Sequence, residues 1–281
     1  MIKNLILIDT SYVCFYRFFA IKRWYSLAHS EEYKELKDNK DYDWSTNEIF
    51  MEKYEKKYFD EIIKLIGKKN FAKSYFLFCM DSPREKIWRN LYKEDYKGDR
   101  FDLTEKYNFK PVFKYTYDKL IPQIINKYNN SSKIRINELE ADDIIAIISK
   151  TVNKDISTFI ISGDNDFLQL GRENLYFIKF KSKAQNITPE EAQKSLLIKI
   201  VKGDKSDGIE SIFPKRTMNT KKIDELLESQ EKFNNYLEKN SIVNDNFNKN
   251  RILIDFNYIP KKYIDIVNKE FSNSCKSLIT K

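Results

Sequence analysis

Short apolar runs that end in an acidic residue constrain the fold of this chain more than any other feature. Residues 5–8 form one such run, followed by Asp9, and residues 75–80 form another, followed by Asp81. Runs of this length that are apolar at every position are typical of strands buried on both faces of a parallel sheet. Further strands are expected at three later places: 134–136, 158–161 and 176–180.

The segments between these strands have helical character, so the chain alternates strands and helices. Helices are expected at four places: 11–20, 46–66 with its end near Gly67, 121–128, and 140–150 with an apolar isoleucine face. Such an alternation predicts an α/β fold with a parallel sheet. From Thr188 onward the chain is expected to be helical, because Thr188 followed by Pro189 is a strong helix start.

Two later segments need a separate interpretation. The Lys- and Asn-rich stretch 240–250 is expected to be a loop. The run 252–256 imitates the first strand and its acid, but it follows helices instead of starting a strand–helix unit. It is therefore interpreted as a packing segment and not as a source of ligands.

Composition excludes several kinds of chemistry. The three cysteines are far apart and odd in number, which argues against a disulfide scaffold or a zinc site. The only histidine, His29, precedes a charged run and is interpreted as a surface residue, so no Ser-His-Asp mechanism is expected. No phosphate-binding loop motif and no apolar stretch of membrane-spanning length is found. An intracellular, reducing compartment is expected.

The charge balance is compatible with a polyanionic partner. The formal net charge is +8 and the pI is about 9.0. A basic chain can bind nucleic acid, but charge alone is weak evidence. The chemistry must rest on carboxylates, lysines and arginines.

Acids recur at strand ends and helix starts along the chain. The carboxyl ends of strands in an open parallel sheet meet at one edge, where sites form. The full set is nine acids: Asp9, Asp81, Glu140, Asp142, Asp143, Asp164, Asp166, Asp204 and Asp207. Packed together they would repel by several kcal/mol, so the cluster requires cations. All-oxygen ligands favour Mg²⁺ or Mn²⁺, and two such ions can clamp a scissile phosphate. An isolated strand-end aspartate more often caps a helix, so the ordered set carries the argument.

These residues also form motifs of a known family. Residues 5–11 and 16–20 resemble the opening of the 5′-nuclease domains of the flap endonuclease superfamily. The four residues Glu140-Ala141-Asp142-Asp143 resemble the family's E-A-D-D motif. Residues 162–170 are similar to its S-x-D-x-D-F-x-Q-L motif, and residues 203–207 to its G-D-x-x-D motif.

Two further segments extend the resemblance. One is similar to the family's R…Y-K-x-x-R segment: it follows Asp81 and consists of Trp88-Arg89 and residues 96–100. Residues 251–260 resemble the branch formed by the ribonucleases H of T-even phages. The resemblance implies a PIN-like core over 1–186, with an arch region at about 84–119, and a helical DNA-binding region over 187–281 that completes the site.

The resemblance also implies roles for individual residues. Around the first of two Mg²⁺ ions, for which Mn²⁺ can substitute, it groups Asp9, Asp81, Asp142 and Asp164. Around the second it groups Asp166, Asp204 and Asp207, with Glu140, while Asp143 supports the site from behind. Cations that contact the phosphate near the cut are Lys97 and Arg100, with Arg84, Arg89 and Lys93 as weaker candidates. The glycines of the family's helical hairpin after Gly208 are missing, so Lys215 and Arg216 are expected to hold the duplex electrostatically.

The implied function is a structure-selective 5′ to 3′ nuclease that removes RNA primers and adjacent DNA during replication. Its expected partners are DNA and RNA–DNA duplexes with a 5′ end or flap, a phage single-strand-binding protein and a sliding clamp. A monomer in the cytoplasm of an infected bacterial host is expected. Two alternatives stay open: a small PIN-type ribonuclease acting on single-stranded RNA, and an inactive nucleic-acid-binding protein. The basic region after Asp166 argues against the first, and the complete acid set argues against the second.

Overall fold

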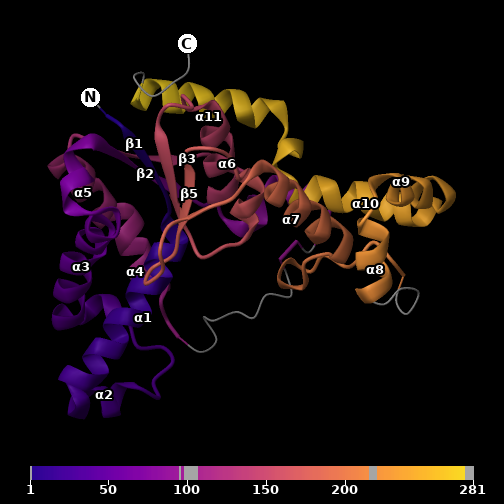
Figure 1. Ribbon diagram of the computed structural model, residues 1–281. Coiled ribbons are helices and arrows are strands. Elements are labelled where there is room, and N and C mark those ends of the chain that lie inside the picture. Colours follow the sequence, from indigo (N-terminus) through magenta and orange to yellow (C-terminus); the bar gives the residue numbers. More distant parts are fainter. Residues whose placement is uncertain (1, 95, 98–106, 215–219, 276–281) are drawn as a thin grey trace.

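The computed structural model describes residues 2–94, 96–97, 107–214 and 220–275 (Figure 1). Its centre is a sheet with the strand order β3-β2-β1-β4-β5-β6. The strands are β1 (Asn4–Asp9), β2 (Ser74–Met80), β3 (Ser131–Arg135), β4 (Ser157–Ile161), β5 (Leu175–Ile178) and β6 (Gln185–Asn186). All neighbouring pairs are parallel except β5 and β6. The predicted α/β fold with a mainly parallel sheet is therefore confirmed.

The register of the sheet brings the ends of the central strands to one level. Asp9 at the end of β1 lies opposite Cys79 of β2, and Ile8 lies opposite Ile161 at the end of β4. The chain runs from β1 outward through β2 and β3, then returns to the other side of β1 with β4. Ligand sites of open parallel sheets form at such a reversal of strand order, outside the carboxyl ends.

Alternate residues of β1 feed two separate cores, because neighbouring strand residues point to opposite faces. Leu5 and Leu7 belong to one core, and Ile6 and Ile8 belong to the other. The Ile6 face is covered by α1 (Thr10–Ala28), α3 (Glu48–Ile66), α4 (Lys110–Tyr115) and α5 (Ile121–Lys127). The Leu5 face is covered by α6 (Ala141–Thr151), α7 (Pro189–Lys202), the end of α10 (Ser241–Ile254) and α11 (Lys261–Ser274).

Local signals set several of the helix ends. Asn47 caps the start of α3, and Gly67, with φ +89°, ends it. Thr188 and Glu191 form a reciprocal capping box at the start of α7. The helix predicted at 11–20 is longer than expected, and a second helix, α2 (Ser30–Leu36), follows it. A π-helical turn, Thr116–Leu120, joins α4 to α5.

The loop predicted at 240–250 is wrong, because these residues form most of α10. Val243 packs into a third core with Val201, Ile212 and Phe233. The Asn250 amide donates to the carbonyl oxygens of Ile200 and Glu210, both at 2.9 Å. Tertiary contacts thus override the low helix propensity of asparagine. The run 252–256 ends this helix and packs into the sheet core, as expected of a packing segment.

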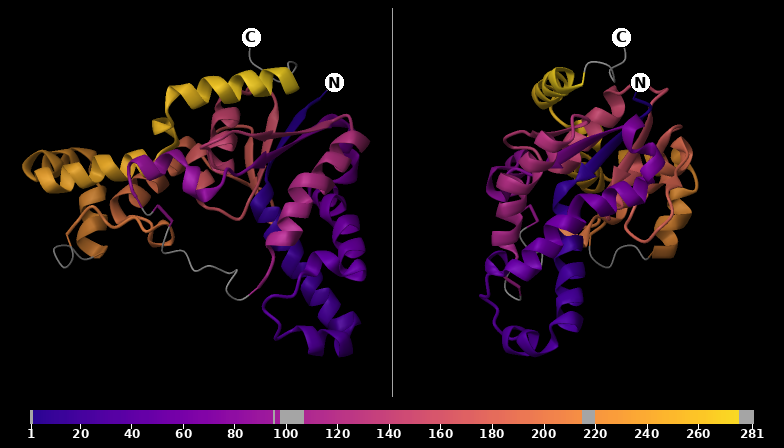
Figure 2. Two further views of the ribbon diagram at one scale, coloured as in Figure 1. Left: turned by 180° about the vertical axis from the view of Figure 1, so that it is seen from behind. Right: turned by 90° about the vertical axis from the view of Figure 1, so that its left-hand side faces the viewer.

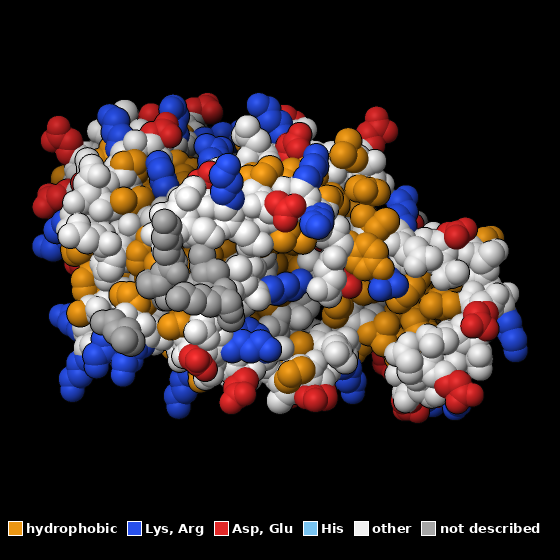
Figure 3. Space-filling model, turned by 90° about the horizontal axis from the view of Figure 1, so that it is seen from above, with side chains coloured by type: hydrophobic (Ala, Val, Ile, Leu, Met, Phe, Trp, Pro, Cys, Tyr) orange, Lys and Arg blue, Asp and Glu red, His pale blue; other side chains and the backbone are white. Residues whose placement is uncertain are grey.

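The later helices form a lobe beside the sheet. α8 (Thr220–Leu227), α9 (Gln230–Lys239) and the first part of α10 lie together and project away from the sheet, on the side remote from α2 and α3 (Figures 1 and 2). Among the described helices, none combines the length and the apolar character that a membrane crossing requires. On the face seen in Figure 3, lysines and arginines are interspersed with acids, so the excess positive charge is not gathered into one patch there.

Candidate active site

A cleft of about 820 Å³ lies at the carboxyl edge of the sheet. Predicted ligands line it from β1, β2, α6, the loop after β4 and the turn after α7: Asp9, Asp81, Glu140, Asp142, Asp164, Asp166 and Asp204. The remaining predicted ligand, Asp207, has a carboxylate oxygen within 4.8 Å of oxygens of Asp166 and Asp204. The structure therefore brings together the eight acids predicted as metal ligands.

Asp9 stands at the junction of β1 and α1. Its carboxylate accepts the backbone N–H of Tyr12 at 3.0 Å, which caps α1, and the Ser162 hydroxyl at 2.7 Å. The side chain is nearly buried. Burial, together with the neighbouring Asp81 charge, raises the pKa of Asp9 to about 7. The acid is therefore costly to ionise unless a cation is present.

Asp81, just after β2, is held by a chain of hydroxyl groups. It accepts the Ala141 backbone N–H at 2.8 Å and the Ser11 hydroxyl. The Tyr117 hydroxyl lies 2.9 Å from Ser11 Oγ. Ser11 has one proton, which it donates to Asp81, so Tyr117 must donate to Ser11. Burial raises the pKa of Asp81.

Tyr117 was missed by the sequence reasoning. It lies in the π-helical turn between α4 and α5, a distortion that often accompanies functional sites. Its surroundings in the chain, Tyr115-Thr116-Tyr117-Asp118, contain no recognisable motif. The signal lies in the three-dimensional contact alone.

The start of α6 supplies Glu140 and Asp142. Glu140 is the N-cap residue and forms a reciprocal capping box with Asp143. Burial raises the pKa of Asp142 well above its usual value, and the nearby charges of Asp164 and Asp9 add to this although Lys97 opposes it. Asp142 is therefore a second acid whose ionisation requires a cation.

The loop after β4 has little space. A side chain at Gly163 would place a Cβ 2.6 Å from the Tyr12 ring, so any other residue there would require the ring to move. Asp164 accepts the backbone N–H of Asp166 at 2.9 Å, and its own N–H donates to Ser162 Oγ at 3.1 Å. These contacts hold both carboxylates at the cleft.

The turn after α7 carries Asp204 and Asp207. Gly203 has φ +75°, and a Cβ there would lie 2.4 Å from the Ile209 carbonyl oxygen. This glycine allows Asp204 and Ile209 to exchange two backbone hydrogen bonds, at 2.8 and 2.7 Å. Asp207 is buried in the turn and accepts the Tyr96 hydroxyl at 3.2 Å.

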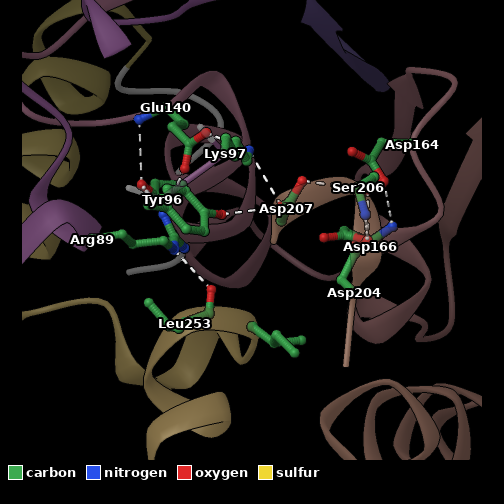
Figure 4. Close-up of polar contacts among 12 residues, drawn as sticks. Arg89, Tyr96, Lys97, Glu140, Asp164, Asp166, Asp204, Ser206, Asp207 and Leu253 are labelled. Carbon is green, nitrogen blue, oxygen red and sulfur yellow. Dashed lines mark hydrogen bonds and ion pairs between the residues drawn. The ribbon is translucent and has the colours of Figure 1, made fainter. Parts of the chain in front are cut away.

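Two lysine ammonium groups lie among the acids, and Figure 4 labels one of them, Lys97. Lys97, a predicted phosphate contact, is buried, and its Nζ lies 2.5 Å from Glu140 Oε1 and 3.6 Å from Asp207 Oδ2. Lys199, which the sequence reasoning missed, pairs with Asp166 and Asp204. Burial alone would raise the pKa of Asp204, but hydrogen bonds from Lys199 and Ser206 lower it to about 2.

Arg89, predicted to contact nucleic acid, is buried in this structure and does not line the cleft. Its side chain is 2% exposed, because it extends from η4 (Trp88–Leu91) to α6 and the end of α10. Nε donates to the Leu253 carbonyl at 2.9 Å (Figure 4). Nη2 donates to Asp143 at 2.7 Å and Nη1 to Glu140 at 3.0 Å. Asp143 is fully buried and also accepts the Trp88 indole N–H at 3.0 Å. Asp143 and Arg89 therefore support Glu140 from behind.

The other predicted cations differ in position. Arg84 is exposed and lines the cleft. Lys93 is half-buried after η4 and does not line the cleft. Arg100, Lys215 and Arg216 lie outside the described residues.

The donor set fits divalent cations. It consists of carboxylate oxygens from several rigid elements, and burial and mutual repulsion raise the pKa of three of its members, Asp9, Asp81 and Asp142. Hard, oxygen-ligated ions such as Mg²⁺ and Mn²⁺ suit this chemistry.

Comparison with known proteins gives three kinds of match. Residues 4–197 match the family described as 5′-3′ exonuclease, N-terminal resolvase-like domain. Ribonuclease H of Enterobacteria phage T4 is 26% identical over 210 residues, which is 68% of this chain and 68% of that protein. A 5′-3′ exonuclease of Mycoplasmopsis pulmonis is 28% identical over 196 residues, 66% of this chain and 62% of that protein.

Two solved structures of the phage T5 D15 protein share the fold. The one crystallised with metal ions has a TM-score of 0.63 at 15% identity and covers 96% of this chain and 99% of its own. The other, described as a flap endonuclease pseudo-enzyme-product complex with DNA and metal ions, has a TM-score of 0.62 at 15% identity and covers 98% and 100%.

Proposed function

This chain belongs to the 5′-3′ exonuclease family of nucleases, and we propose that it is a structure-selective 5′ nuclease that hydrolyses DNA and RNA–DNA duplexes at a 5′ end or flap. The observation that carries the proposal is the cleft itself, in which acids from five separate segments meet at the carboxyl edge of the sheet. The name of the T4 relative, ribonuclease H, supports the removal of RNA primers. The description of the T5 relative supports cleavage of flaps.

Two Mg²⁺ ions, or Mn²⁺ in their place, are the cofactors of this proposal. One would be held by Asp9, Asp81, Asp142 and Asp164. The other would be held by Asp166, Asp204 and Asp207, with Glu140. When bound, such a pair neutralises charge on the scissile phosphate and activates water for in-line hydrolysis.

The chain's own residues have three tasks in this reaction. The hydroxyls of Ser162 and Ser11 hold the carboxylates of Asp9 and Asp81 in fixed orientations. Lys97, at the cleft wall, offsets charge that develops on the phosphate. The rings that line the cleft, such as Phe15, offer apolar surface to an unpaired base.

The test is cleavage of a 5′-labelled flapped duplex with Mg²⁺ and with EDTA. Asp142→Asn should abolish cleavage while duplex binding remains, because only a cation ligand is lost. Asp155→Asn is the matched control, since Asp155 is exposed in the loop that precedes β4, at the opposite edge of the sheet. Duplex binding without cleavage in either Mg²⁺ or Mn²⁺ would refute the proposal and favour a binding protein.

The role in primer removal is tested with a separate pair of substrates. A nicked duplex whose 5′ segment is RNA is compared with the same duplex made wholly of DNA. Short 5′ products from both are expected, because phosphate and metal contacts do not depend on the 2′-hydroxyl. Cleavage of single-stranded RNA alone would instead indicate the PIN-type ribonuclease.

A further inference from the structure

A lysine from the last turn of α7 lies inside the group of acids assigned to the second cation. Lys199 Nζ contacts Asp166 Oδ1 and lies 2.7 Å from Asp204 Oδ2. Asp166, Asp204 and Asp207 have oxygens within 4.8 Å of one another. The ammonium group therefore uses oxygens that a metal ion at this position would need.

The environment of Lys199 differs from that of an ordinary surface ion pair. Its side chain is 23% exposed, and those of Asp166 and Asp204 are 18% and 16% exposed. Lys202, one turn further along the same helix, pairs with the single acid Asp224 at 2.8 Å on the surface. Shielding from solvent strengthens the Lys199 contacts, and the convergence of two acids on one ammonium group is the arrangement a cation site provides.

Taking the proposed function as its basis, we propose that Lys199 is a displaceable counter-cation of the second metal position. In the metal-free protein its ammonium group offsets the repulsion between Asp166 and Asp204. An incoming Mg²⁺ or Mn²⁺ competes for the same oxygens, so it must break both contacts. The displaced ammonium remains in the cleft, which Lys199 already lines, and there adds positive charge for the phosphodiester.

The first test is a calorimetric titration with Mn²⁺ in the absence of nucleic acid. Lys199→Met should bind Mn²⁺ at the second metal position about tenfold more tightly than the unaltered protein, equal to about 1.4 kcal/mol, because the competing charge is gone. Lys199→Arg keeps the charge and should retain the original affinity. Lys202→Met, the matched control, should also leave it unchanged. Unchanged or weaker binding by Lys199→Met overturns the proposal.

The second test uses the unaltered protein, so it does not depend on how a variant folds. Lysine acylation is followed by mass spectrometry with EDTA and with Mn²⁺, and Lys202 serves as the internal reference. The reactivity of Lys199 relative to Lys202 should rise several-fold when Mn²⁺ binds, because the amine leaves its two acids. A ratio that stays constant or falls contradicts displacement.

Both tests separate this inference from the proposed function. Neither contains a nucleic acid, so a chain that binds Mn²⁺ with the expected competition but cleaves nothing would support the inference and refute the nuclease proposal. Cleavage without any change in the affinity of Lys199→Met would do the opposite. Failure of every protein to bind Mn²⁺ would overturn the inference.

Discussion

Replacement of Arg89 should destabilise the protein far more than replacement of any neighbouring exposed cation. Arg89 is buried with all three guanidinium nitrogens in hydrogen bonds to the Leu253 carbonyl, Asp143 and Glu140. In Arg89→Met, the hydrogen-bond donors that remain for the Asp143 carboxylate are the Trp88 indole N–H and the backbone N–H of Glu140. Removal of one partner of a buried ion pair costs about 3–5 kcal/mol.

The expected loss of unfolding free energy is therefore about 4 kcal/mol for Arg89→Met. It is measured by urea unfolding in EDTA, and the slope m of the variant is compared with that of the unaltered protein. Lys86→Met is the matched control, because Lys86 is exposed in the preceding turn and should change the free energy by less than about 0.5 kcal/mol.

A double variant separates the ion pair from simple packing. Arg89→Met with Asp143→Asn should be more stable than Arg89→Met alone, because the uncompensated buried charge is gone. A cost below about 1 kcal/mol for Arg89→Met, or no recovery in the double variant, would refute the reasoning.

Three further outcomes are expected. Tyr117→Phe removes the donor to Ser11 and should raise the Mg²⁺ concentration needed for half-maximal cleavage about tenfold. Tyr115→Phe, which loses a hydrogen bond to Glu55 away from the cleft, should leave that concentration unchanged. Gly203→Ala should lower the unfolding free energy by more than about 2 kcal/mol in urea, because the new Cβ meets the Ile209 carbonyl; an unchanged midpoint contradicts this. In EDTA, the unfolding free energy should fall by up to about 4 kcal/mol as the pH rises from about 4 to 7. The reason is that Asp9 has a pKa of about 7 in the folded protein, so over this range the folded protein keeps a proton that the unfolded chain has lost. Asp9→Asn should remove this part of the pH dependence, and a fall of equal size in Asp9→Asn would count against Asp9 as its source.

The convergence of the acids could be predicted because it follows from local rules. Residues 5–8 and 75–80 are apolar throughout, which identifies both as buried strands of a parallel sheet. The carboxyl ends of such strands lie at one edge of the sheet, and the observed register brings the acids that follow them together. The G-D-x-x-D turn after α7 likewise needs a glycine at positive φ, a requirement visible in the sequence.

The contacts that could not be predicted join positions without a local pattern. Lys199 is 33 residues from Asp166, and Tyr117 is 106 residues from Ser11. The buried position of Arg89 could not be predicted, because the Leu253 carbonyl that accepts from it lies 164 residues away. Charge counting cannot distinguish an arginine that faces solvent from one that faces a distant carbonyl.

The network around Arg89 also has a consequence for the order in which the enzyme is assembled on the ribosome. Asp9 is synthesised before the other acids of the cleft, and Asp204 and Asp207 are synthesised 195 and 198 residues after it. The Leu253 carbonyl that holds Arg89 emerges later still. An incomplete nascent chain therefore lacks acids of the cleft or the anchor behind Glu140, and the full constellation exists only once synthesis has passed α10.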